Sequence, residues 1–245
     1  MNISSDTKVG RLVVDHPVTA DVFEKYGIDF CCNGNKTLAA ACEEKQISFE
    51  TLRTELLERK QRAEEQNLVS GPDFRTWPLD LLADYIEKTH HRYVERNLPA
   101  LCRYLEKIKM VHGQAHPELE TIAAIFSESA GELTKHMKKE ELILFPFIRK
   151  LSRMKEKGQS VEPSAAGAVQ HPVRMMMHDH DAEGERFRKI AKLSNNYTPP
   201  ADSCATYRAA YAKLEEFERD LHQHIHLENN LLFPRAIEME KQLSA

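Results

Sequence analysis

Two segments of the sequence share one arrangement of histidine, glutamate, phenylalanine and proline. Both read His-x-x-x-Glu-x-x-x-x-Phe-Pro, beginning at His136 and at His224, so the pattern recurs at an offset of 88 residues. A histidine and a glutamate four positions apart lie on the same face of a helix. Imidazole and carboxylate groups together suit metals such as iron, manganese or zinc. The repeat therefore predicts two related helices that meet at one metal centre.

The apolar pattern indicates that both His-Glu pairs face a core. In each segment, apolar residues lead to the pair in steps of three and four, as on the buried face of a helix. The expected faces are Ile122, Phe126, Ser129, Leu133, His136, Glu140 and Ile143, and Tyr207, Tyr211, Leu214, Phe217 or Leu221, His224, Glu228 and Leu231. A lone buried pair is usually satisfied by local hydrogen bonds. Because an unpaired buried carboxylate is costly, a duplicated pair favours a cation between the groups.

Two further histidines complete the predicted ligand set. His180 lies on the apolar face of the segment 172–195. On the segment 78–111, His90 and His91 compete, because the apolar residues before and after them favour different faces. Spacing favours His91, which precedes His136 by 45 residues, close to the 44 between His180 and His224. The predicted metal ligands are His91, His136, Glu140, His180, His224 and Glu228.

Six such ligands can hold two metal ions, with two imidazoles for each ion and both carboxylates able to bridge. Bridged pairs of this kind resemble the di-iron or di-manganese sites of helical bundles, and we predict two non-haem iron ions. A structural zinc site would need only four ligands and is often rich in cysteine. His222 and His226 are expected to flank the site, and Glu141 is expected to be solvated.

Four long helical segments must position these ligands. They are expected at 78–111, 117–154, 172–195 and 203–242, and their connections predict a four-helix bundle. Ahead of them, short helices are expected at 18–26, closed by Gly27, then from a cap at Thr37, and from a cap at Ser48. We therefore predict an all-α protein with a small helical domain over 1–62, a linker over 63–76 and the bundle over 77–245.

The composition supports this fold and excludes some partners. Of 245 residues, 41% are hydrophobic and only nine are glycine, and no alternating β pattern is present. The formal charge of -4 provides no basic surplus for nucleic acid. No apolar run is long enough to cross a bilayer, and residues 1–10 lack the apolar segment of a signal peptide. We expect a cytoplasmic protein that binds neither nucleic acid nor membrane, with its five cysteines reduced.

Two adjacent cysteines, Cys31 and Cys32, lie in an expected loop over 29–35. They could accept iron, bind a nitrosyl group or supply electrons, and a nearby helix start at Thr37 would lower a thiol pKa. Alternatively, they are two small residues in a tight turn, since a vicinal disulfide would form a strained ring. The other cysteines, at 42, 102 and 204, are expected to be buried.

The two motifs together resemble a known family. The His-x-x-x-Glu-x-x-x-x-Phe-Pro repeats resemble the hemerythrin-like domain, and the segment Asp29–Leu38 resembles an ScdA-type N-terminal domain. The combination resembles the repair of iron centres family over nearly the whole chain. One departure precedes His180, where the family has Glu-His-Asp and this chain has Asp179 in place of the glutamate.

The resemblance implies a di-iron protein that repairs iron–sulfur clusters damaged by nitrosative or oxidative stress, by supplying iron rather than by turnover catalysis. Its partners would be iron–sulfur cluster proteins as clients, with nitric oxide or oxygen as a small ligand. Cys31 and Cys32 would exchange iron, electrons or nitrosyl groups. A homodimer is left open. The alternatives are a nitric-oxide- or oxygen-binding carrier or sensor, which has no need of a cysteine domain, and a nitric oxide reductase.

Overall fold

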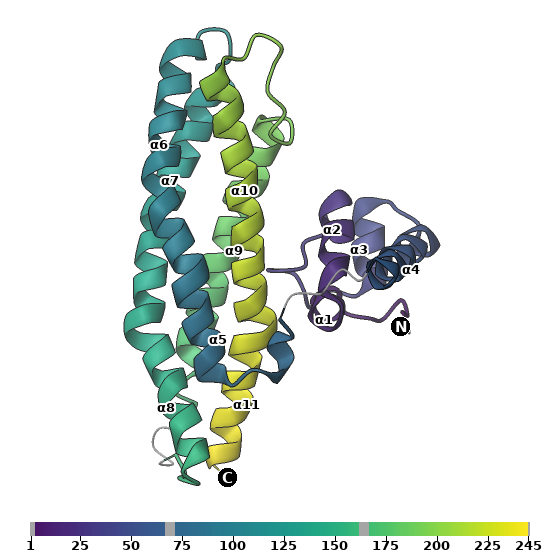
Figure 1. Ribbon diagram of the computed structural model, residues 1–245, viewed down its shortest axis with the longest axis vertical. Coiled ribbons are helices and arrows are strands. Elements are labelled where there is room, and N and C mark those ends of the chain that lie inside the picture. The colour runs from purple at the N-terminus through teal and green to yellow at the C-terminus, as the bar shows by residue number, and fades with distance from the viewer. Residues whose placement is uncertain (1–2, 67–71, 162–166, 245) are drawn as a thin grey trace. The chain divides into compact units, whose positions relative to one another are not determined.

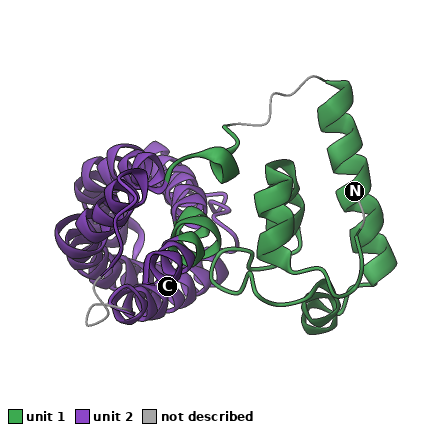
Figure 2. Cartoon of the chain, turned by 90° about the horizontal axis from the view of Figure 1, so that it is seen from below, with its two compact units in different colours: residues 1–78, 225–235 green, residues 79–224, 236–245 purple. Residues whose placement is uncertain are grey.

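The structure is a computed structural model that describes residues 3–66, 72–161 and 167–244. In these ranges the regular elements are helices, with one isolated β-bridge between Lys8 and Thr37, so the prediction of an all-α fold is confirmed. The contacts divide the chain into unit 1 (Met1–Pro78 with Ile225–Arg235) and unit 2 (Leu79–His224 with Ala236–Ala245), shown in Figure 2. Among the described residues, no helix combines the length and the apolar character needed to span a membrane.

The N-terminal part of unit 1 consists of short helices. They are α1 (Val9–Asp15), η1 (Pro17–Thr19), α2 (Ala20–Lys25), α3 (Leu38–Lys45), α4 (Phe49–Glu65) and η2 (Phe74–Thr76). Gly27 follows α2 with a φ of 61°, as its capping role requires. Thr37 caps α3 by accepting a hydrogen bond from the Ala40 N–H at 3.2 Å. Ser48 is the N-cap residue of α4, as predicted, but its side chain makes no capping hydrogen bond.

Helix α1 was not predicted, because glycine and β-branched residues have weak helix propensity. Its residues Val9, Leu12, Val13 and Val14 are buried, so tertiary packing stabilises this helix more than its local sequence does. The expected linker over 63–76 begins inside α4, and residues 67–71 of it lie outside the described residues. The boundaries of the two predicted domains stay a prediction.

Two glycines allow α1 to approach the loop that precedes α3. The Gly10 N–H donates to the Gly34 carbonyl at 2.8 Å, and the Val9 N–H donates to the Lys36 carbonyl at 3.0 Å. These bonds satisfy N–H groups at the start of α1 that have no partner within the helix. A Cβ added at Gly10 would lie 2.9 Å from the Gly34 Cα and 2.4 Å from the Asn230 Oδ1. The contact therefore leaves no room for a side chain at residue 10.

We expect Gly10→Ala to lower the free energy of unfolding by about 1–3 kcal/mol, the usual cost of overpacking a close contact. The matched control is Gly131→Ala, inside the helix α7 (Glu118–Lys139), where an added Cβ meets nothing within 4 Å. That change should stabilise the protein by about 0.5–1 kcal/mol through helix propensity. Denaturant titration followed by circular dichroism measures both. Stabilisation by both alanines would contradict the close contact.

Unit 2 contains most of a four-helix bundle, whose long helices lie side by side in Figure 1. Rod 1 is α5 (Leu79–Ile86), η3 (Glu87–His91) and α6 (Arg92–His112). Rod 2 is α7, η4 (Glu140–Leu144) and α8 (Phe145–Glu156), and rod 3 is α9 (Gln170–Leu193). Rod 4 is α10 (Ala205–Leu227), η6 (Glu228–Leu232) and α11 (Phe233–Ser244). Rod 4 is one continuous helical run, although its residues Ile225–Arg235 are grouped with unit 1.

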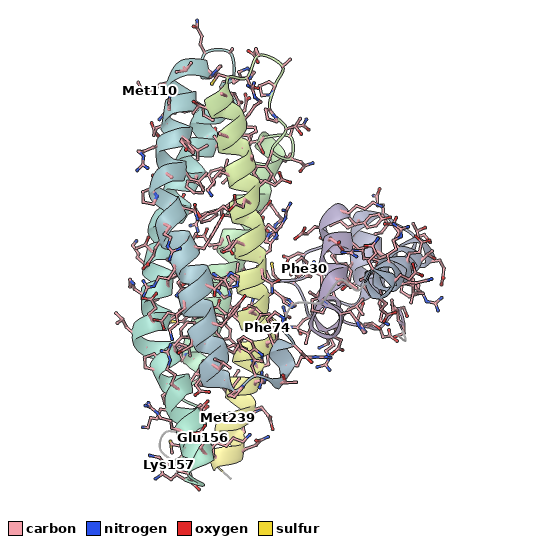
Figure 3. All side chains as sticks on the ribbon, in the orientation of Figure 1. Phe30, Phe74, Met110, Glu156, Lys157 and Met239 are labelled. Carbon is pink, nitrogen blue, oxygen red and sulfur yellow. The ribbon has the colours of Figure 1, made fainter. Side chains whose placement is uncertain are left out.

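Aromatic rings fill one part of the bundle core. The Phe217 ring lies 5.7 Å from the Phe126 ring and 5.8 Å from the Phe187 ring, between centroids. All three side chains are fully buried, and burial of this kind contributes roughly 2–3 kcal/mol for each phenylalanine. By contrast, the labelled Met110 on α6 points outward and is 83% exposed (Figure 3). The apolar interior thus fixes how the rods face one another.

Three of the rods contain a π-helical turn within their described residues, namely η3, η4 and η6. In η4 the Phe145 N–H donates to the Glu140 carbonyl, and in η6 the Phe233 N–H donates to the Glu228 carbonyl, each five residues back. Pro146 follows Phe145, and Pro234 follows Phe233. Neither proline has an N–H that could donate the next helical hydrogen bond. Such turns add one residue to the helix and are frequent at functional sites.

The π turns change which residues face the core. Ile143 was predicted to be buried but is 61% exposed, whereas Leu144 is 1% exposed. The prediction failed because η4 adds a residue after Glu140. In rod 1, η3 lies between Ile86 and His91 and adds one residue to the helix. The apolar residues before it, which favour His90, and those after it, which favour His91, therefore lie on one continuous face. Both His90 and His91 are consequently buried.

Candidate metal centre

The structure brings the six predicted ligands together. All are buried, and they form two groups, His91, Glu140, His224 and Glu228, and His136, Glu140, His180 and Glu228. Within each group, one potential ligand atom per residue lies within 4.8 Å of the others. Glu228 follows His224 by one turn of the same continuous rod. Ligands on opposite sides of an ion, at bonds of about 2.1 Å, are about 4.2 Å apart. Each group therefore has nearly the dimensions of a metal site.

Individual distances in unit 2 agree with this reading. The Glu140 Oε2 lies 3.3 Å from the His136 Nε2 and 3.4 Å from the His91 Nε2. The Nε2 atoms of His136 and His180 are 3.0 Å apart. Two nitrogens bound at right angles to one ion would be about 3.0 Å apart, and without an ion this contact is a hydrogen bond between the rings. The residues present fit a pair of ions bound by imidazole and carboxylate.

Carboxylates outside the groups orient two of the imidazoles. The His91 Nδ1 lies 3.1 Å from the Glu141 Oε1, and the His136 Nδ1 lies 3.4 Å from the Asp179 Oδ2. A carboxylate on Nδ1 fixes the tautomer that leaves Nε2 available to a metal. Hydrogen bonds from His136 and Lys139 hold the pKa of Asp179 below its usual range. Asp179, shorter than the glutamate usual in the family, therefore still reaches His136.

The expectation that Glu141 is solvated is wrong. Its side chain is 10% exposed and also contacts the Lys138 Nζ at 2.5 Å. Glu141 contacts His91, which lies on another rod. The helical pattern of residues 136–146 therefore does not reveal this contact. The sequence offered only one sign of a partner for the Glu141 carboxylate, which is Lys138 three positions earlier on the same helix.

We expect Glu141→Ala and Asp179→Ala each to weaken metal binding by about 10–100-fold, because the imidazole they orient loses its fixed tautomer. The matched control is Glu132→Ala on the same rod, since the Glu132 side chain is exposed and pairs with the exposed Lys135 at 2.9 Å. Titration against a competing chelator measures the affinities. Equal affinities in all three variants would show that these carboxylates do not orient the ligands.

The remaining histidines of interest lie outside both groups. The His90 Nδ1 lies 3.0 Å from the Asp220 Oδ1, and its ring stacks on the His224 ring at 5.7 Å. His226 is buried and its Nδ1 lies 3.1 Å from the Asn230 Nδ2. Burial lowers the pKa of His226 to about 4, which keeps its ring neutral at pH 7. His222 lies 3.9 Å from Glu218. The structure thus favours His91 over His90 as the group member on rod 1.

Two features were missed or misjudged from the sequence. Glu183 on α9 is buried, accepts a hydrogen bond from the Ser129 Oγ at 2.6 Å and pairs with Arg186. Its burial raises the pKa of its carboxyl group. Cys204 was expected to be buried but is exposed at the start of α10, where the backbone N–H of Tyr207 lowers the pKa of the thiol to about 7. Cys42 is buried as expected, and Cys102 is half-buried.

The loop with the adjacent cysteines belongs to unit 1. The Asp29 Oδ1 accepts hydrogen bonds from the Cys31 N–H at 3.1 Å and the Cys32 N–H at 2.8 Å. The two sulfur atoms are 3.8 Å apart, so they form no disulfide. The hydrogen bond between the thiols, together with burial, raises the pKa of Cys31 well above its usual value. The expected lowering of a thiol pKa by the start of α3 is therefore not seen at Cys31.

Comparisons with known proteins cover nearly the whole chain. A family model described as the hemerythrin HHE cation binding domain matches residues 82–236, and the ScdA_N model, a domain of unknown function, matches residues 5–60. The iron-sulfur cluster repair protein YtfE of Musicola paradisiaca is 35% identical over 235 residues, which are 96% of this chain and 98% of that protein. YtfE of Yersinia pseudotuberculosis is also 35% identical, over 95% of this chain and 97% of its own. This chain belongs to the YtfE family of iron–sulfur cluster repair proteins.

Membership of the YtfE family agrees with the geometry. The hemerythrin-type match spans all six residues of the two groups, from His91 to Glu228. The N-terminal match spans Cys31 and Cys32. The prediction of an ScdA-type domain followed by a hemerythrin-like domain is confirmed, and the buried histidine and glutamate groups of this YtfE-family protein are suited to metal binding.

Proposed function

We propose that this YtfE-family protein binds two iron ions, one in each buried group, and supplies iron to iron–sulfur clusters damaged by nitrosative or oxidative stress in the cytoplasm. The observation that supports this most is the sharing of Glu140 and Glu228 between two groups that each have two histidines of their own. The proposed ligands are the six predicted residues. The names of the relatives support the cluster-repair role.

The shared carboxylates suit a protein that gives up iron. If His91 and His224 release their ion, His136 and His180 still have both glutamates beside them, so one group keeps four protein donors. Loss of one ion therefore need not collapse the other group. When bound, iron would supply redox chemistry and the binding of small ligands such as nitric oxide or oxygen. The protein's own part is to hold the imidazoles and exclude water from buried carboxylates.

The cysteine loop is proposed to take part in exchange with client iron–sulfur proteins. Cys32 is half-buried whereas Cys31 is buried, so Cys32 is the more accessible of the two to a partner. Asn229 supports the loop by donating from Nδ2 to the Cys31 carbonyl at 3.2 Å. This proposal has three forms, in which the thiols pass on iron, electrons or a nitrosyl group.

The test is to incubate the ferrous protein with an apo ferredoxin-type client, and to measure cluster formation by visible absorbance together with the iron that remains bound. We expect cluster to form as iron leaves the protein, and Cys31→Ser with Cys32→Ser to slow it severalfold without loss of the bundle iron. The matched control is Cys204→Ser, which removes an exposed thiol immediately before α10. Retained iron with no cluster would overturn the proposal, and reductant-dependent consumption of nitric oxide would favour the reductase instead.

A further inference from the structure

A third cluster of metal-binding groups lies in unit 1, separate from the six residues of the bundle. One potential ligand atom from each of Asp29, Cys31 and Cys32 lies within 4.8 Å of the other two. We propose that these three residues form a second metal site, which binds one thiophilic divalent cation such as Fe²⁺ or Zn²⁺. Binding at this site does not depend on the function proposed for the bundle.

The distance between the sulfur atoms is the main evidence. The Cys31 and Cys32 sulfurs are 3.8 Å apart, whereas a disulfide would bring them to about 2.05 Å. Two thiolates bound to one tetrahedral ion at about 2.3 Å have their sulfurs about 3.8 Å apart. The adjacent side chains therefore already have the spacing that such an ion requires.

The carboxylate of Asp29 is placed to be the third ligand. Its Oδ1 lies 3.3 Å from the Cys31 sulfur, near the roughly 3.5 Å expected for an oxygen and a sulfur on one tetrahedral ion. The same carboxylate accepts hydrogen bonds from the Cys32 N–H and from the Asn33 Nδ2, at 2.8 Å and 2.7 Å. The Oδ1 atom also accepts a hydrogen bond from the Cys31 thiol, and a cation bound to both atoms would take the place of that thiol proton.

The loop is held in this conformation by further hydrogen bonds. Within unit 1, the Asn230 Nδ2 donates to the Phe30 carbonyl at 3.2 Å, and Asn229 donates to the Cys31 carbonyl. Gly34 also lies where an added Cβ would come within 2.7 Å of the Phe30 carbonyl oxygen. Because the backbone is fixed on both sides, the three ligand atoms need little rearrangement to bind an ion, which lowers the entropic cost of binding.

Binding involves no change of oxidation state. The S–H bonds of Cys31 and Cys32 break, their two protons pass to solvent, and two metal–sulfur bonds and one metal–oxygen bond form. Affinity should therefore rise with pH. Three protein ligands leave a fourth position open, as in metal sites that react or exchange. If the bundle supplies iron as proposed, a client thiolate could take that position, and this last step alone rests on the proposed function.

The alternative explanation is structural. The hydrogen bonds from the Cys31 and Cys32 N–H groups to Asp29 would stabilise the same turn without an ion, as aspartate side chains commonly do. The two explanations differ in what removal of the carboxylate does. Asp29→Asn retains an oxygen that accepts the N–H bonds but loses the charge, so it should preserve the fold of the loop and weaken a metal site.

Cobalt(II) is the probe, added to the metal-free, full-length protein. Thiolate ligands give cobalt a sulfur-to-metal charge-transfer band in the near ultraviolet, which the histidine and glutamate groups of the bundle cannot produce. We expect one such cobalt per chain with release of two protons, no band in Cys31→Ser or Cys32→Ser, and at least about tenfold weaker binding in Asp29→Asn. The matched controls Cys42→Ser and Cys204→Ser should retain the band.

Three results would overturn the site: no band in the natural sequence, a band that persists without Cys31 and Cys32, or unchanged affinity in Asp29→Asn. Circular dichroism establishes that the serine variants are folded, and serine preserves the size of the side chain. The Glu140→Leu variant should retain the band, because it alters only the bundle. Its result separates failure of this site from failure of the function proposed for the bundle.

Discussion

Glu140→Leu is expected to remove most of the bound metal from the purified protein, and Glu228→Leu is expected to do the same. Each carboxylate belongs to both groups, so one substitution removes a ligand from each proposed ion. Both side chains are fully buried, so bulk water has no access to replace the lost ligand. Metal analysis and the visible absorption spectrum of the iron-loaded protein measure the effect.

The same variants should change stability in opposite directions with and without metal. A ligand present at about 1,000 times its Kd stabilises a protein by roughly 4 kcal/mol. For a chain of this size that is a Tm difference of about 8–16 °C, which the leucine variants should lose. The metal-free leucine variants should be at least as stable as the metal-free parent, because leucine removes a buried carboxylate. Melting curves with and without iron measure both effects.

The matched control for these variants is Glu132→Leu, an equivalent substitution on the exposed face of α7. It should leave the iron stoichiometry and the metal-dependent rise in Tm unchanged. If Glu140→Leu and Glu228→Leu both bound as much iron as this control, the assignment of the shared carboxylates would be wrong.

The adjacent histidines of η3 provide the second test. His91→Ala should weaken metal binding by more than about 100-fold, beyond the range typical of groups that only support a ligand. His90→Ala should retain both ions with a smaller loss. The difference is expected because the His91 Nε2 lies 3.4 Å from Glu140, whereas the His90 Nδ1 contacts Asp220. Chelator competition and metal analysis distinguish the two.

These neighbours control for each other, since both are buried histidines in one turn. Near-normal binding by the His91 variant with loss of iron in the His90 variant would reverse the assignment. An equal, complete loss in both, with retained helicity, would mean that the stack of His90 on His224 matters as much as the ligand itself.

The sequence by itself determined the parts that depend on local periodicity. The repeat beginning at His136 and His224 indicates two equivalent helices, since helical spacing places His and Glu together whatever surrounds them. The predicted all-α class and the ScdA-type and hemerythrin-like architecture are confirmed, and the six predicted residues lie together in the structure. Their role as iron ligands stays a prediction.

Only the tertiary structure decided what depends on contacts between rods and on changes of helical register. The π turns η3 and η4 each shift the core face by one residue, which is why Ile143 is exposed and why the faces of His90 and His91 coincide. A fixed period of 3.6 residues cannot anticipate such a shift. The partners that orient His91 and His136 are likewise distant in sequence. Their pairing arises from packing between rods, for which the local sequence provides no signal.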